Sequence, residues 1–174
     1  MAIQGQSWGG YQVSYLVTRT DMFKAAGAGA PVSNMTSAYG GIRWESGRSR
    51  QFQYEQTQSR IGATMQDSLN LYIANSPVFF ADKVRTPLLI MHNDKDGAVP
   101  WYQGIEYFMT LRRMGKPVWM LQYNNEAHNL RVSQRLLDRQ PVQPLGRHAV
   151  GAAQITAIRQ GNAQVTGHST EGVD

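Results

Sequence analysis

Residues 2–11 read Ala-Ile-Gln-Gly-Gln-Ser-Trp-Gly-Gly-Tyr and contain a Gly-x-Ser-x-Gly frame made by Gly5, Ser7 and Gly9. Such a frame is typical of a nucleophile elbow, in which a strand turns sharply into a helix and the serine occupies the strained corner. The small residues on either side let the strand and the helix approach closely. The serine hydroxyl is then exposed, and the following backbone N–H, that of Trp8, faces a developing oxyanion. Because so short a pattern often arises by chance, a plain Gly/Ser turn stays the alternative unless other residues support the frame.

The composition fits one domain with a hydrophobic core. The chain has 174 residues, 41% of them hydrophobic, and no cysteine. The lack of cysteine excludes a disulfide framework and a thiolate metal site, but it leaves the compartment open between cytoplasm and periplasm. No apolar run reaches the roughly 20 residues that span a bilayer, so we expect no membrane partner, and no signal peptide is visible. Since an α/β sheet normally has strands before an elbow, we expect the chain to begin inside a larger domain.

The positive charge does not indicate a nucleic-acid partner. The formal net charge is +5, but the arginines are scattered and no block of five or more basic residues occurs. Nucleic-acid binding calls for a clustered basic stripe with interleaved aromatic residues. We therefore interpret the charge as a solvated surface.

Apolar strands and helical patterns alternate along the chain. The sequence predicts strands at 2–4, 25–30, 87–92 and 118–123, and helices at 10–20, 34–41, 54–65, 68–75 and 101–114. This alternation predicts βαβ units with a parallel sheet, hence an α/β fold, in which chemistry lies beyond the carboxyl ends of the strands. The polar segment 33–86 is too long for a simple connection, and we expect it to shape a cleft. We expect a domain over 1–140 and a disordered tail over 141–174, which is Gln/Gly/Ala-rich with weak periodicity.

Residues for a serine nucleophile follow the predicted strands. A serine hydroxyl needs a base within hydrogen-bond distance, and that base needs an orienting acid. His128 is the candidate base, with a plain loop histidine as the alternative, whereas His92 ends a strand and suits a structural role. Asp94 and Asp96 compete as the acid, since turn aspartates usually cap backbone N–H groups. There is no His-x-x-x-His pattern, paired-carboxylate cluster or Gly-rich phosphate loop, so we expect neither a metal nor a cofactor.

Three motifs occur in order: Gly-Gln-Ser-Trp-Gly-Gly-Tyr at 5–11, His-Asn-Asp-Lys-Asp-Gly-Ala-Val-Pro at 92–100 and Glu-Ala-His at 126–128. Together they resemble the catalytic domain of the prolyl oligopeptidase family of serine peptidases, and most of all its acylaminoacyl-peptidase and dipeptidyl-peptidase branches. The resemblance implies a Ser7, Asp96 and His128 triad, which selects Asp96 over Asp94. It also implies that Trp8 N–H supplies half of the oxyanion hole, and that Val32 and Val99 bind substrate, with Val32 in the wall of the pocket for the residue before the cut.

The resemblance further implies a partial α/β-hydrolase fold that cleaves short peptides through an acyl-enzyme. Family members have a β-propeller, several hydrolase strands and a second oxyanion donor ahead of the elbow, and we expect these to be missing here. Residue 98 is Ala, where strict dipeptidyl peptidases tend to carry an Asn, which disfavours a proline-specific dipeptidyl peptidase. A carboxylesterase is the alternative function because the same triad serves both reactions. A second alternative is an inactive truncated fragment. Whether this chain is active on its own stays open.

Overall fold

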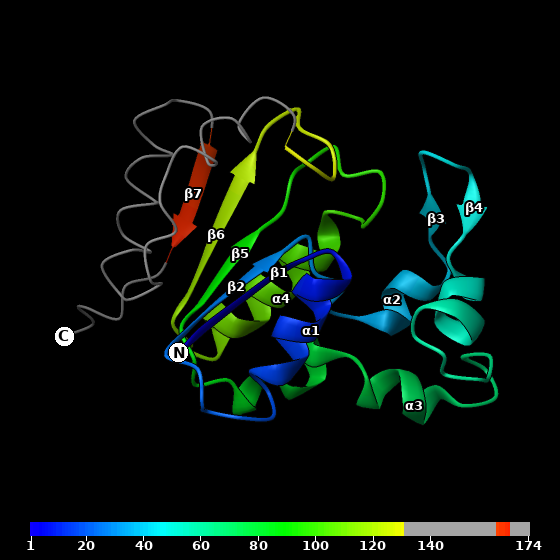
Figure 1. Cartoon of the computed structure of the whole chain (residues 1–174), viewed down its shortest axis with the longest axis horizontal. Helices are drawn as coiled ribbons and strands as arrows, with labels where there is room; N and C mark the ends of the chain where they lie inside the picture. The colour runs from blue at the N-terminus through cyan, green and yellow to red at the C-terminus, as the bar shows by residue number, and fades with distance from the viewer. Residues whose placement is uncertain (131–162, 168–174) are drawn as a thin grey trace.

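A parallel sheet forms the centre of the molecule. The computed structural model describes residues 1–130 and 163–167 (Figure 1). The sheet has the strand order β1-β2-β5-β6-β7. Its strands are β1 (Ala2–Gln6), β2 (Ala25–Gly29), β5 (Leu88–Met91), β6 (Val118–Tyr123) and β7 (Ala163–Gly167). The first four pair in parallel, as the sequence predicts, and β7 pairs antiparallel with β6.

The helices that follow the strands pack on the sheet and bury its core. Helix α1 (Trp8–Leu16) contacts β1 and β2, and α4 (Tyr102–Arg113) contacts β5 and β6. The 3-10 helix η2 (Pro77–Lys83) packs against both α1 and α4. The buried side chains between them form one cluster that includes Val13, Val17, Leu88, Ile90, Tyr107 and Leu111.

Within the described part of the chain, no helix is long and apolar enough to cross a membrane.

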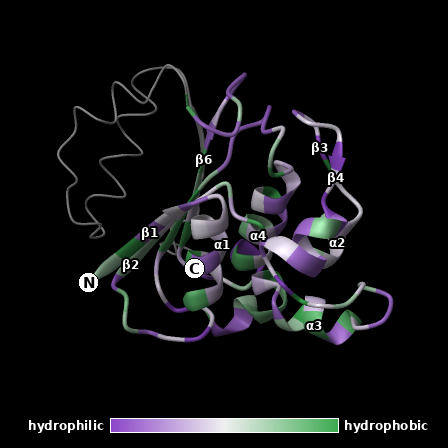
Figure 2. Ribbon diagram, turned by 45° about the vertical axis from the view of Figure 1, so that its right-hand side comes forward, coloured by the Kyte–Doolittle hydropathy of each residue, from purple (hydrophilic) through white to green (hydrophobic). Residues whose placement is uncertain are grey.

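The segment between β2 and β5 builds a second layer away from the sheet. It contains α2 (Met35–Tyr39), the hairpin of β3 (Ile42–Arg43) and β4 (Arg48–Ser49), the π-helical turn η1 (Gln53–Thr57) and α3 (Leu69–Ala74). The chain then returns to the first cluster at η2. Figures 1 and 2 both show α2 and α3 farther from the sheet than α1. Buried Tyr39, Tyr54 and Tyr72 hold this layer together in a second cluster, which Trp8 and Tyr11 join. The layer therefore packs directly against the elbow.

One expectation from the sequence differs from the structure. The helix predicted over 54–65 is wrong beyond residue 57, because Arg60 and Gly62 adopt positive φ angles of 52° and 82° that a right-handed helix does not allow. Ala163–Gly167 lies within 141–174, the stretch for which the sequence predicts a disordered tail, and supplies hydrogen-bond partners to the outer edge of β6 as β7. The remainder of 141–174 lies outside the described residues.

Candidate active site

Ser7 occupies a strained corner between β1 and α1. Its backbone has φ 60° and ψ −117°, a conformation that costs a non-glycine residue about 1–3 kcal/mol. Two backbone hydrogen bonds fix the corner: Ser7 N–H donates to Gly29 O at 2.8 Å, and Tyr11 N–H donates to Ser7 O at 2.9 Å. The Ser7 side chain makes no capping hydrogen bond to the helix. Its hydroxyl therefore stays available for other partners.

The close approach at the elbow depends on Gly5 and Gly10. A Cβ at Gly5 would lie 2.4 Å from Gly9 O, and one at Gly10 would lie 2.2 Å from Gly29 O. Both contacts are to backbone atoms, which cannot move aside without shifting the strand or helix. A Cβ at Gly9 would meet nothing within 4 Å. The second glycine of the sequence frame, Gly9, is therefore not required by a steric contact at its Cβ position. The second close contact is made by Gly10 instead.

Asp96 and His128 form a buried acid–imidazole pair. His128 Nδ1 lies 2.7 Å from Asp96 Oδ2, and Asp96 Oδ1 accepts hydrogen bonds from Ala98 N–H and Val99 N–H at 2.8 Å each. Burial disfavours the charged carboxylate, but the hydrogen bonds from His128, His92 and Val99 outweigh burial and hold the pKa of Asp96 well below its usual range. Asp96 is therefore an ionised acceptor that fixes the proton of His128 on Nδ1.

The two loops that carry Asp96 and His128 are joined by further hydrogen bonds. Asn93 Nδ2 donates to Ala127 O at 2.6 Å, and Lys95 N–H donates to Glu126 O at 3.2 Å. Asp94 Oδ1 accepts from Asn125 N–H at 2.7 Å. Of the two acids that compete in the sequence, Asp96 thus lies at the imidazole and Asp94 ties the neighbouring turn.

His92 is a second imidazole on the same carboxylate. Its Nε2 lies 3.3 Å from Asp96 Oδ2 and 3.1 Å from Val99 O, so this nitrogen carries the hydrogen and donates to both acceptors. The ring is almost fully buried against α4, where a Cβ at Gly104 would lie 2.6 Å from His92 Nδ1. This placement fits the structural role expected at a strand end, because His92 orients Asp96 rather than facing the elbow.

Gln6 joins the elbow to the histidine loop. Its Nε2 donates to His128 O at 3.0 Å, which holds the loop next to Ser7. Within residues 1–130, no hydrogen bond links Ser7 Oγ to His128 Nε2, and catalytic hydrogen bonds are often long in unliganded sites.

Trp8 is the first residue of α1, where an amide N–H has no partner within the helix. In the described part, no three His, Asp or Glu side chains gather as metal ligands would.

A small pocket opens at the elbow, and both predicted substrate-binding valines line it. Its walls include Ser7, Trp8, Val32, Val99 and Arg50. The segment that carries Val32 is fixed to α4, because Gln103 Oε1 accepts from Ser33 N–H at 3.1 Å and from Asn34 N–H at 2.9 Å. The β3–β4 hairpin closes another side, since Trp44 N–H donates to Gly97 O at 2.9 Å.

A family model described as the prolyl oligopeptidase family matches residues 1–140. The chain belongs to the prolyl oligopeptidase family. It is 31% identical over 140 residues to the acylamino-acid-releasing enzyme of Sus scrofa, a match that covers 75% of this chain and 18% of that protein. It is 30% identical over 130 residues to the uncharacterized peptidase YuxL of Bacillus subtilis, covering 75% and 19%.

The structural comparison confirms a partial α/β-hydrolase fold for this family member. An acylaminoacyl peptidase of Pyrococcus horikoshii superposes with a TM-score of 0.62 at 26% identity, covering 77% of this chain and 20% of that one. The chain thus spans about a fifth of the length of the relatives that it matches. The parallel sheet with helices packed on it agrees with the fold class expected from the sequence.

Several residues that shape the candidate site of this member of the prolyl oligopeptidase family were not predicted from the sequence. Gln6 occupies a variable position of the elbow frame, and nothing in the pattern indicates its contact with His128. Asn93 follows a strand end in a polar turn, a position that could have marked it as a loop-fixing residue. Arg50 lies in a polar stretch in which an exposed side chain is the ordinary expectation, and the sequence carries no signal for its burial.

Proposed function

We propose that this chain carries the catalytic residues of a serine peptidase that hydrolyses peptides. Ser7 is the nucleophile, His128 the general base and then acid, and Asp96 the orienting carboxylate. The observation that carries the proposal is the 2.7 Å contact between Asp96 Oδ2 and His128 Nδ1, on a loop that Gln6 ties to the elbow. Membership of the prolyl oligopeptidase family supports the same reaction class.

The proposed reaction has two halves. Ser7 Oγ attacks the carbonyl carbon of the scissile amide while His128 Nε2 accepts the hydroxyl proton. The C–N bond then breaks as His128 returns that proton to the leaving amine, which leaves an acyl group on Ser7. In the second half, water gives a proton to His128 and attacks the acyl carbon. The bond between that carbon and Ser7 Oγ then breaks as His128 returns the proton to Oγ, which releases the carboxylic acid product.

Two groups stabilise the charges that form during these steps. Asp96 stays ionised throughout, because its hydrogen bonds hold its pKa well below the usual range, and it stabilises the imidazolium of His128. Trp8 N–H donates to the oxyanion that develops on the carbonyl oxygen.

The longer relatives guide the proposal for the whole protein. Two of the proteins that this chain resembles are described as an acylamino-acid-releasing enzyme and an acylaminoacyl peptidase, and we propose short peptides as the substrate class here as well. Because the chain covers only 18% of the former and 20% of the latter, we propose that the complete protein adds N-terminal hydrolase strands and a β-propeller.

A paired substrate panel tests the proposed function against the esterase alternative. The complete gene product is assayed on a peptide p-nitroanilide and on p-nitrophenyl acetate, beside its Ser7→Ala variant. We expect Ser7-dependent cleavage of the amide, with kcat reduced about 10⁴- to 10⁶-fold in the variant. Ser7-dependent turnover of the ester alone would favour the esterase. Amide cleavage that persists in Ser7→Ala would refute the assignment of the nucleophile.

A further inference from the structure

Arg50 is a buried cation at the edge of the elbow pocket, and two of its side-chain nitrogens lack a hydrogen-bond partner among the described residues. It directly follows β4, its N–H donates to Gly41 O at 3.0 Å, and the residue is only 3% exposed. The side-chain Nε and Nη2 are both buried and have no hydrogen-bond partner among the described residues. An isolated buried charge is strongly unfavourable unless a counter-charge or hydrogen bonds compensate it. Arg50 therefore has unused donor capacity beside Ser7.

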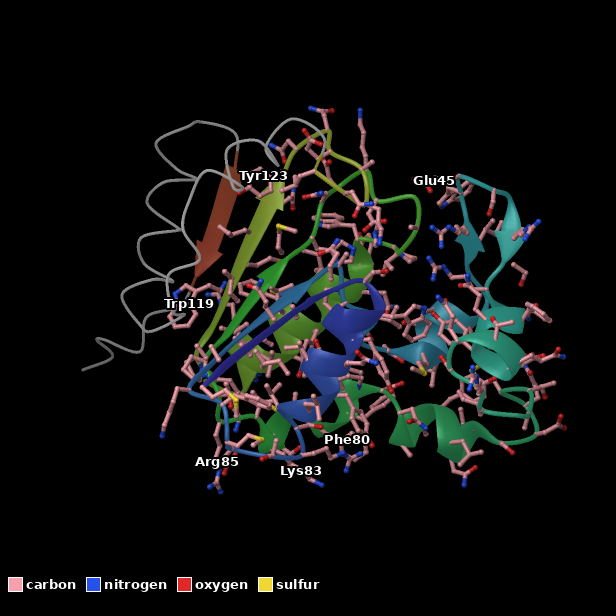
Figure 3. All side chains as sticks on the ribbon, in the orientation of Figure 1. Glu45, Phe80, Lys83, Arg85, Trp119 and Tyr123 are labelled. Atoms are coloured by element: carbon pink, nitrogen blue, oxygen red, sulfur yellow. The ribbon has the colours of Figure 1, made fainter. Side chains whose placement is uncertain are left out.

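The carboxylates nearest in the fold are engaged elsewhere. Glu45, at the outer end of the β3–β4 hairpin in Figure 3, lies 3.9 Å from Arg43. Glu55 accepts a hydrogen bond from the Tyr39 hydroxyl. Asp96 is occupied by His128, His92 and two backbone amides. No acidic side chain of the described chain lines the pocket.

The neighbouring phenol does not supply the missing negative charge. Tyr54 is fully buried against the ring of Trp8, with centroids 6.1 Å apart. Burial raises the pKa of Tyr54, even though the positive charge of Arg50 opposes that shift. Tyr54 is therefore a neutral phenol at physiological pH.

We propose that Arg50 binds a carboxylate of the substrate, namely the side chain of an acidic residue directly before the cleaved bond. Arg50 lines the same pocket as Ser7, so a carboxylate bound to it in that pocket would lie close to the attacked carbonyl. The planar fork of arginine matches a carboxylate through two parallel hydrogen bonds. The apolar walls formed by Val32 and Val99 suit the methylene stem of an aspartate or glutamate. This inference rests on the proposed peptidase function and names its substrate class.

Matched acidic and neutral substrates test the proposal in the complete gene product. Ac-Ala-Glu-p-nitroanilide is compared with its Gln analogue, and the Asp analogue with its Asn analogue. We expect the wild type to prefer the acidic member in kcat/KM, and Arg50→Gln to lower that preference about 10- to 100-fold. Arg50→Lys keeps the charge but not the fork, and should retain part of the preference. Arg48→Gln removes the same charge from an exposed position two residues away and should leave the preference unchanged.

A second substrate pair distinguishes a side-chain carboxylate before the cut from a C-terminal carboxylate after it. Ac-Ala-Gln-Ala is offered with a free or an amidated C-terminus, so that the only carboxylate lies after the cut. An Arg50 dependence confined to this pair would contradict the assignment to the residue before the cut. Arg50→Gln effects of equal size on acidic and neutral substrates would overturn carboxylate binding and leave Arg50 as a structural residue.

A binding measurement keeps the inference independent of turnover. In the Ser7→Ala background, calorimetry compares Ac-Ala-Glu-NH₂ with Ac-Ala-Gln-NH₂, with and without Arg50→Gln. Tighter binding of the Glu peptide that depends on Arg50 supports the site even if the wild type cleaves no peptide. Equal binding of the two peptides overturns it, even if Ser7 proves to be the nucleophile.

Discussion

The elbow and the loops that carry Asp96 and His128 hold their proposed catalytic groups in different ways. Ser7 is placed by backbone geometry, with a positive φ of 60° and glycines at 5 and 10 that let β1, α1 and β2 meet. His128 is placed by polar contacts, because the loop before it receives hydrogen bonds from Asn93 and Lys95 and its ring bonds to Asp96. Steric changes should therefore damage the elbow, whereas losses of charge or hydrogen bonding should damage the loops.

The largest expected effect is on the acid. Asp96→Asn should lower kcat about 10⁴-fold, because the imidazole of His128 loses its correct tautomer and its counter-charge. Kinetics on a peptide p-nitroanilide measure the change. Asp94→Asn is the matched control, two residues away in the same loop. If the control loses activity and Asp96→Asn does not, Asp94 is the catalytic acid.

A steric test at the elbow compares two adjacent glycines. Gly10→Ala places a Cβ against Gly29 O and should destabilise the protein by about 1–3 kcal/mol. Gly9→Ala meets no neighbour and should stabilise helix α1 by about 0.5–1 kcal/mol. Thermal unfolding of both variants measures the difference. Equal loss of stability would show that both positions need glycine.

The buried carboxylate predicts a pH dependence of stability. The pKa of Asp96 is lowered in the folded state, so its hydrogen bonds stabilise the fold above the ordinary aspartate value of about 3.9. That stabilisation is lost progressively as the pH falls below this value towards the folded-state pKa. Urea unfolding between pH 2 and 6 should show a steeper loss of stability for the wild type than for Asp96→Asn. Parallel curves would mean that Asp96 titrates normally.

The smallest expected effect is on the turn acid. Asp94→Asn keeps the side-chain oxygen that faces Asn125 N–H but removes its charge, and should cost about 1 kcal/mol at most. Urea unfolding at neutral pH measures this change. A loss of several kcal/mol would show that Asp94 has a larger part in fixing the histidine loop than its one bond indicates.

The same contrast explains how far the sequence predicted the structure. The strands at 25–30, 87–92 and 118–123 were predictable because each is a short apolar run with turn residues after it. Ser7, Asp96 and His128 were proposed as a group from the sequence because each follows a predicted strand end. The geometry then brings Asp96 and His128 together and places Gln6 between His128 and the elbow.

Most of the features that the sequence did not predict depend on distant contacts. The role of Gly10 comes from the carbonyl of Gly29 on a neighbouring strand, and that of Gln6 from a loop more than a hundred residues away. Arg50 is buried by the hairpin and the tyrosine layer around it, which local polarity does not reveal. The helix predicted over 54–65 ends early because Gly62 adopts a positive φ, which the polar pattern did not indicate.

Active-site labelling tests the central claim most directly. A fluorophosphonate probe reacts with an activated serine, and mass spectrometry of the labelled complete gene product identifies the modified residue. We predict one adduct on Ser7, which disappears in Ser7→Ala and forms far more slowly in His128→Gln and Asp96→Asn. Label on another residue, or label on Ser7 at an unchanged rate in both of these variants, would contradict it.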